Sequence, residues 1–312
     1  MPELIAIGEC LVEFIPDGPL DRATTFTRGF GGDTCAAAIM AARLGTKCGY
    51  ISRIGNDPLG DYVVRKWRDA DLDLSAVRRT DTYTGLFISS RQTSELKAVL
   101  YFRQGAAGSE LQPSDLPEGF PGSARVVHLS GVTQALSKSA RETIYQAARQ
   151  AHDAGALVSF DINYRPRLWT ALEARKALDE VLPFTDIVLP STPEDTVPLL
   201  GIEAPEDAAK YFHDAGIPIV AVKAGARGAH VQWDGGSLAI EASKVDVVDA
   251  SGAGDAFAGA LLHCLIRGAA PDQAGRIAVA AAELMVRRTG AIAGLPSRGE
   301  VERVLPHGML LP

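Results

Sequence analysis

The sequence has few cysteines and no apolar run long enough to cross a membrane. No run approaches the roughly 18 residues that a membrane-spanning helix requires. The N-terminal stretch MPELIAIGEC has no basic segment ahead of its apolar residues, so we expect no signal peptide. The cysteines are scattered and lack the spacing of metal ligands, which predicts reduced thiols in a cytoplasmic protein; they are Cys10, Cys35, Cys48 and Cys264.

Positive charge is also scarce. Lys and Arg number 31 against 38 Asp and Glu, which gives a net charge of −7, and no basic block is longer than a pair. A nucleic-acid partner requires a concentrated basic face, so this charge pattern argues against one. The 312 residues, of which 46% are hydrophobic, fit one large domain, or one domain with a small accessory piece.

Short apolar runs alternate with amphipathic helical stretches along most of the chain. Each run is rich in Val, Ile or Leu and ends in small or polar residues, as buried strands do. The stretch 137–155 is typical of the helices, because it opens on a Ser cap and closes on Gly. This alternation predicts a doubly wound parallel sheet, whose ligands bind at the carboxyl ends of the strands. The predicted strands span 4–8, 125–131, 155–163, 186–191 and 217–225.

Two regions, 11–30 and 82–103, depart from this alternation. Both have the pattern of short antiparallel strands joined by turns. Together they predict a small β-sheet that lies over the main α/β unit as a lid. We therefore predict a single domain over 1–312, with lid strands from about 11–30 and 82–103. Because lid strands expose their edges, we also predict a homodimer, or a higher homo-oligomer, built through the lids.

The stretch DASGAGDAFAGALL, residues 249–262, places glycines and an acid ahead of a helix of small residues. Its loop Gly252-Ala253-Gly254 should lie at the helix N-terminus, where unpaired backbone N–H groups and the helix dipole favour an anion. Asp255 then falls in the first turn. The chain has no P-loop string, and Phe257 interrupts a dinucleotide fingerprint. An ordinary glycine-rich helix entry stays open on this pattern alone.

The same stretch resembles the second signature of the ribokinase-like (PfkB) carbohydrate kinases, and the first signature has counterparts as well. These are RGFGGDTCAAAIMAARLG, residues 28–45, and GNDPLGDYV, residues 55–63. The resemblance runs from Ile5 to about Arg303. It implies a ribokinase-like α/β fold, with a doubly wound, mostly parallel sheet flanked by helices and a small β-sheet lid. It also implies ATP-dependent phosphorylation of a hydroxyl group.

The resemblance assigns the chemistry to the glycine-rich loop. It implies that Gly252, Ala253 and Gly254 form an anion hole for the transferred phosphoryl group and that Asp255 is the catalytic base. Phosphoryl transfer depends mainly on positioning and on charge stabilisation, which such a loop provides. We expect the helix N-terminus to keep Asp255 ionised and thus a weak base. A loose transition state tolerates a weak base, because the hydroxyl proton can leave late.

Several segments resemble the 2-keto-3-deoxygluconate kinases within this family, namely GGDT, YFRQGAAGS, HLSGVTQALS and DINYRPRLW. A sugar acid carries a carboxylate, so its site should hold more Arg than a neutral-sugar site. Strand periodicity puts Tyr101 and Arg103 on one face, and Arg165 follows a buried strand. The resemblance implies an acceptor site of Gly32, Asp33, Tyr101, Arg103 and Arg165, in which Asp33 holds hydroxyls.

For the nucleotide, the resemblance indicates the segments LPSTPED, residues 189–195, and VKAGARG, residues 222–228. Glycine lets the second loop pass close to a nucleotide, although a plain turn between two strands fits it equally well. Glu194 is expected to arrange hydrated Mg²⁺ indirectly, since Mg²⁺ keeps several waters. The implied cofactors are ATP and Mg²⁺, and a monovalent cation is left open. The implied nucleotide-binding residues are Ser191, Lys223, Gly225 and Gly228.

Other interpretations of these residues stay open. Arg103 fits an exposed edge strand with a solvated side chain, and Arg165 fits a salt bridge to a neighbouring acid. The nearest alternative function is that of a fructokinase or another neutral-sugar kinase of the same family. A sugar-sensing regulatory protein on the kinase fold is an alternative without catalysis, and a dehydrogenase is disfavoured by Phe257.

Overall fold

The computed structural model describes residues 1–91, 97–122 and 124–312. The apolar runs predicted as strands form the centre of a nine-stranded sheet, in the order β13-β12-β11-β10-β9-β8-β1-β4-β5. Neighbours pair in parallel from β5 to β11, and β12 and β13 add antiparallel. The strands are β1 (Leu4–Ile7), β4 (Cys48–Gly55), β5 (Val77–Thr80), β8 (Val126–Ser130), β9 (Leu157–Asp161), β10 (Ile187–Leu189), β11 (Ile219–Lys223), β12 (Ala229–Trp233) and β13 (Gly236–Ile240).

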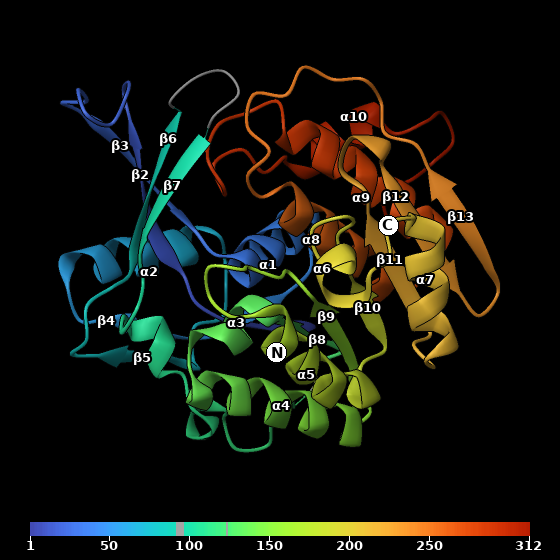
Figure 1. Ribbon diagram of the computed structural model, residues 1–312, viewed down its shortest axis with the longest axis horizontal. Helices are drawn as coiled ribbons and strands as arrows, with labels where there is room; N and C mark the ends of the chain where they lie inside the picture. The colour runs from blue at the N-terminus through green and yellow to red at the C-terminus, as the bar shows by residue number, and fades with distance from the viewer. Residues whose placement is uncertain (92–96, 123) are drawn as a thin grey trace.

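Helices cover both faces of this sheet (Figure 1). Strand side chains alternate between the faces, so Leu4 and Ala6 of β1 belong to one buried core, whereas Ile5 and Ile7 belong to the other. Apolar residues of α1 (Asp33–Leu44), α8 (Ala253–Ile266) and α9 (Pro271–Met285) fill the first core. Those of α4 (Lys138–Asp153), α5 (Ala171–Val181) and α7 (Pro205–Asp214) fill the second.

Shorter elements complete this arrangement, which confirms the predicted fold class. The remaining α-helices are α2 (Pro58–Asp69), α3 (Gly131–Leu136), α6 (Thr196–Leu200) and α10 (Arg298–Val304). Single turns of 3-10 helix are η1 (Ala107–Glu110), η2 (Pro113–Asp115), η3 (Leu182–Phe184) and η4 (Gly225–Arg227). Within the three described ranges, no helix combines the length and the apolar character needed to cross a bilayer.

A second, four-stranded sheet lies at the upper left of Figure 1, and α2 contacts it through Tyr62, whose ring packs against Phe30. Its strands follow the order β3-β2-β6-β7 and are β2 (Leu11–Pro16), β3 (Phe26–Gly31), β6 (Leu86–Arg91) and β7 (Lys97–Phe102). We call this sheet the lid sheet. Residues 92–96 of the predicted lid segment 82–103 lie outside the described residues.

The pairing inside the lid sheet differs from the prediction at one place. The pairs β2–β3 and β6–β7 are antiparallel, as expected, but the central pair β2–β6 is parallel. The strands β2 and β6 follow β1 and β5 of the large sheet, run in the same direction and pair with one another. The returning strands β3 and β7 are therefore left at the edges.

Candidate active site

The glycine-rich loop lies at the N-terminus of α8, as the sequence predicted. Gly252 is the residue that precedes the helix and has φ 79° and ψ 0°, a left-handed conformation that favours glycine. A Cβ atom on Gly252 would lie 2.6 Å from the carbonyl oxygen of Ala291, so the loop also lacks space there. No side chain caps this helix end. The N–H group of Ala253 donates to the carbonyl oxygen of Ala250 at 3.3 Å, and the other N–H groups of this first turn are directed at whatever binds there.

Asp255 occupies the first turn of α8, but its ionisation differs from our expectation. Burial raises the pKa of its carboxyl group well above the ordinary value, and the carboxylates of Asp33 and Asp161 raise it further. Lys223 and Arg165 oppose this shift without cancelling it. The prediction that the helix N-terminus makes Asp255 a weak base is therefore wrong. A carboxylate with a raised pKa is a better proton acceptor.

Lys223 brings a cation to the same place. It ends β11, and its Nζ donates to Oδ2 of Asp161, the last residue of β9, at 2.6 Å. The pair is buried, and Oδ1 of Asp161 has no hydrogen-bond partner within the described part of the chain. Nζ would lie 3.5 Å from a Cβ atom on Gly254. The ammonium group therefore borders the helix N-terminus at which an anion would bind.

Asp33 lies at the start of α1, where the carboxyl ends of two strands meet it. Its Oδ2 accepts hydrogen bonds from Oγ of Ser130, the last residue of β8, and from Nδ2 of Asn163 at 3.0 Å. The preceding residue, Gly32, touches the backbone of the β1–β2 connection, because a Cβ atom there would overlap the carbonyl oxygen of Glu9. The structure thus brings Gly32 and Asp33 to the edge of the sheet that also carries Asp161.

Three arginines border a cavity of 790 Å³ between β7 and the connection from β9 to α5. Arg103 and Arg165 were predicted there, and Arg167 was not. Nη1 of Arg167 donates to the carbonyl oxygen of Val99 at 3.0 Å and so joins the two segments. No acidic residue is found among the described residues that line the cavity, which are Val99, Leu100, Tyr101, Arg103, Gln104, Ala135, Leu136, Arg165, Pro166, Arg167 and Leu168.

Arg103 is not a free cation, because it pairs with an acid that the sequence analysis missed. Its Nη2 donates to Oε1 of Glu9, which is 3% exposed. Burial, with Arg165 nearby, lowers the pKa of Arg103 to about 10, so it stays charged at neutral pH. Glu9 lies two residues after the end of β1. Searching the carboxyl end of every predicted strand, the first included, would have found it.

The family model of pfkB carbohydrate kinases matches residues 1–298. The chain belongs to this family. Among curated proteins, it is 36% identical to the 2-dehydro-3-deoxygluconokinase of Thermoproteus tenax, over 98% of this chain and 94% of that protein. The match spans both sheets and includes the cluster around Asp255, so this PfkB protein is a sugar kinase.

Solved structures agree with this assignment. A 2-dehydro-3-deoxygluconokinase from Thermotoga maritima superposes with a TM-score of 0.90 at 25% identity and covers 97% of this chain and 99% of that one. A putative ribokinase II from E. coli, in complex with ATP and Mg²⁺, superposes with a TM-score of 0.88 at 28% identity, over 97% and 98% of the two chains. Both likenesses extend over nearly the whole kinase.

The residues predicted for the nucleotide are only partly brought together. Ser191 follows β10 and forms a bridge with Lys223, and its N–H donates to Oδ2 of Asp195 at 2.7 Å. Glu194 is exposed and forms none of the hydrogen bonds or ion pairs found among the described residues. A Cβ atom on Gly228 would overlap the carbonyl oxygen of Ile240. Packing therefore explains this glycine without a ligand.

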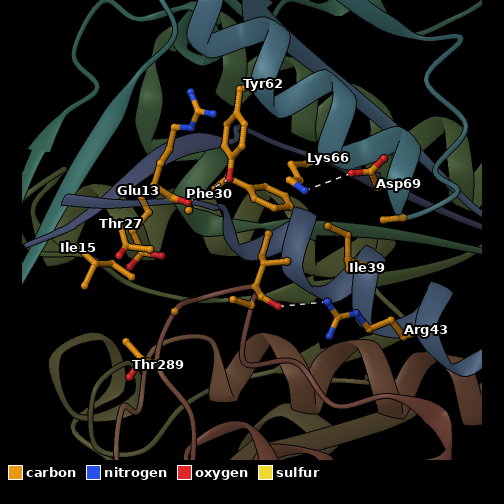
Figure 2. Close-up of a pocket in the computed structure, with 16 residues that line it drawn as sticks. Glu13, Ile15, Thr27, Phe30, Ile39, Arg43, Tyr62, Lys66, Asp69 and Thr289 are labelled. Carbon is orange, nitrogen blue, oxygen red and sulfur yellow. Dashed lines mark hydrogen bonds and ion pairs between the residues drawn. The ribbon is translucent and has the colours of Figure 1, made fainter. Parts of the chain in front are cut away.

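The loop that presses on Gly252 is held by α1 (Figure 2). Figure 2 shows a second cavity, of 590 Å³, with Arg43 reaching across it to the loop 289–293. The guanidinium group of Arg43 donates to the carbonyl oxygens of Ile292, at 3.4 Å, and of Leu295. The carbonyl of Ala291 lies against Gly252 in this loop. Arg43 therefore helps to fix the wall of the candidate anion hole.

The described residues contain no cluster of three or more His, Cys, Asp or Glu side chains that could hold a metal ion. Mg²⁺ that is bound together with a nucleotide needs no such cluster, because it usually keeps several waters and uses one or two carboxylates together with phosphate oxygens. Exposed Glu194 has its carboxylate available for such an indirect contact.

Proposed function

We propose that this PfkB kinase phosphorylates a hydroxyl of a small sugar acid, most simply 2-keto-3-deoxygluconate, to give the 6-phosphate. The observation that carries the proposal is the cavity with three arginines and, among its described lining residues, no acid. Guanidinium groups bind carboxylates with paired, charge-assisted hydrogen bonds. The names of the Thermoproteus tenax and Thermotoga maritima relatives support the same acceptor.

In the proposed reaction, Asp255 takes the proton of the acceptor hydroxyl. The hydroxyl oxygen attacks the γ-phosphorus of ATP, the bond from this phosphorus to the bridging oxygen breaks, and ADP leaves. The N–H groups of Gly252, Ala253 and Gly254 hold the transferring group at the start of α8. Lys223 adds positive charge beside them. Mg²⁺ bound with the nucleotide would neutralise its phosphate oxygens.

The remaining roles follow the same proposal. Asp33, fixed by Ser130 and Asn163, holds acceptor hydroxyls beside Gly32. Tyr101 lines the cavity, and its ring stacks on that of Phe87 with centroids 5.7 Å apart. Nucleotide contacts are assigned to the predicted residues Ser191, Lys223, Gly225 and Gly228, and the indirect Mg²⁺ contact to Glu194.

We further propose a single domain over residues 1–312, with the segments 11–30 and 82–103 as a lid that closes over the acceptor. Closure would exclude water, which otherwise competes with the sugar for the phosphoryl group. The lids of two copies would pair in a homodimer. A cytoplasmic location and the use of a monovalent cation stay predictions from the sequence.

A neutral-sugar kinase is the second candidate, because Glu9 already offsets the charge of Arg103. The deciding experiment measures ATP-dependent release of ADP with 2-keto-3-deoxygluconate, its galactonate epimer and fructose. Asp255→Asn keeps the shape of the side chain but cannot accept the proton, so turnover should fall at least about 10²-fold while ATP still binds. Turnover on fructose alone would disprove the sugar-acid acceptor, and an active Asp255→Asn enzyme would disprove the base.

A further inference from the structure

Glu9 and Arg103 form an ion pair in which both partners are buried. The side chains are 4% and 11% exposed, respectively. The attraction within a buried ion pair outweighs the cost of removing both charges from water only when further hydrogen bonds satisfy both groups. Arg103 is incompletely satisfied, since its Nε is buried without a partner in the part of the chain that the structure describes. The pair is therefore poorly suited to stabilising the fold alone.

Glu9 is held in place by three neighbours, Tyr50, Gly32 and Gly108. The hydroxyl group of Tyr50 donates to the carbonyl oxygen of Glu9 at 2.9 Å. The same carbonyl oxygen lies against Gly32, and Gly108 packs so closely that a Cβ atom on it would lie 2.6 Å from Cβ of Glu9. Glu9 thus has little freedom to move, and its carboxylate is held at the end of β1.

Arg103 shares the cavity with a second cation, Arg165. Both Arg103 and Arg165 line it, and Arg165 lowers the pKa of Arg103 in addition to burial. Two guanidinium groups that line the same cavity repel each other. Because Glu9 attracts Arg103, it counteracts this repulsion. The carboxylate therefore keeps Arg103 near Arg165 before any acceptor arrives.

We propose that Glu9 is a positioning residue that holds Arg103 beside Arg165, so that both guanidinium groups receive the carboxylate of the acceptor. This inference rests on the sugar-acid acceptor proposed above. Oε1 of Glu9 accepts a hydrogen bond from the Nη2 group of Arg103, and Nη1 forms no hydrogen bond with the described residues, which leaves it for the ligand. Because both cations are already in place, binding of the acid does not have to order their side chains. The acid therefore binds more tightly.

The test compares Glu9→Ala with the wild-type kinase. Without its partner, Arg103 should lose its fixed position, and KM for 2-keto-3-deoxygluconate should rise at least about tenfold. The KM for ATP should stay within about twofold, because Glu9 acts through Arg103. Glu9→Gln should restore part of the loss, since its amide oxygen can still accept from Nη2. The matched control is Glu3→Ala at the other end of β1, where Glu3 pairs with Arg267 at 2.5 Å.

An unchanged KM for the acid in folded Glu9→Ala would overturn the proposal, and so would equal rises in both KM values. If Glu9→Ala does not fold, Glu9→Gln decides alone: a KM for the acid raised about threefold supports the role, and a wild-type KM refutes it. If the wild-type kinase phosphorylates no sugar acid, calorimetry with gluconate still tests Glu9. Weaker gluconate binding in the variant supports the role, whereas equal binding, or no binding to the wild type, refutes it.

Discussion

Asp255 lies where its neutral form is favoured, although the proposed reaction requires its carboxylate. Burial and the carboxylates of Asp33 and Asp161 raise its pKa, and Lys223 and Arg165 compensate only in part. Removing a proton from this group therefore costs free energy in the folded kinase. The raised pKa makes Asp255 a stronger base but lowers the stability of the fold. This loss of stability can be measured separately from turnover.

Asp255→Asn should therefore stabilise the fold at neutral pH. With a raised folded pKa, the native state keeps a proton that the unfolded chain, with an Asp pKa of about 3.9, has lost. Stability is thus lost as the pH rises from about 4 through the folded pKa, and Asn removes this loss. Thermal unfolding at pH 4 and pH 8 should show a higher Tm for the variant only at pH 8, by about 2 °C for each kcal/mol gained.

The control is Asp272→Asn, because Asp272 also lies in the first turn of a helix, α9. Its carboxylate interacts favourably with the helix dipole, so this variant should be slightly less stable than the wild type. A Tm of Asp255→Asn at or below the wild-type value at pH 8 would contradict the argument.

The N-terminus of α8 is the element on which the proposed chemistry depends. Gly252 has a positive φ and the carbonyl oxygen of Ala291 beside it, so Gly252→Ala both strains the backbone and moves the loop. Backbone strain of this kind costs about 1–3 kcal/mol. We expect kcat to fall at least about tenfold in Gly252→Ala, because the N–H groups no longer meet the transferring group correctly.

Gly268 provides the matched control at the other end of the same helix. It has a φ of 82°, similar to that of Gly252, but open space where a Cβ atom would stand. Gly268→Ala should therefore lose about 1 kcal/mol of stability and keep its kcat. Steady-state kinetics and urea unfolding on both variants test this difference. If both variants lost kcat equally, backbone strain would explain the loss, and the clash with the carbonyl oxygen of Ala291 would not.

The sequence predicts the large sheet well and the lid sheet less well, for a physical reason. Strands such as β1 and β9 are buried on both faces, so their apolar runs are unmistakable. The parallel pairing of β2 with β6 depends on how two distant segments meet, and no local pattern encodes it. The same limit applies to the site. The glycine loop is a local motif, whereas the Glu9–Arg103 pair and the pKa of Asp255 arise from residues far apart in the sequence.

At the scale of the whole molecule, the lid sheet carries several large apolar side chains that are exposed. Phe26 on β3 and Leu100, Tyr101 and Phe102 on β7 are 43% to 53% exposed. These strands are also the two edges of the lid sheet. Exposed aromatic residues beside unpaired strand edges mark surfaces on which another chain docks. This arrangement supports the proposed homodimer.

Phe102→Glu tests the dimer, because Phe102 is 53% exposed and belongs to neither of the two cavities described above. Buried aromatic residues contribute about 2 kcal/mol or more to interfaces, so the dimer Kd should rise at least about tenfold in sedimentation velocity. Leu172→Glu is the control, since Leu172 is 66% exposed on α5, away from the lid. A wild-type kinase that sediments as a monomer at all concentrations contradicts the dimer. If Phe102→Glu dissociates and its KM for the acceptor also rises, the partner subunit holds the lid in place for binding.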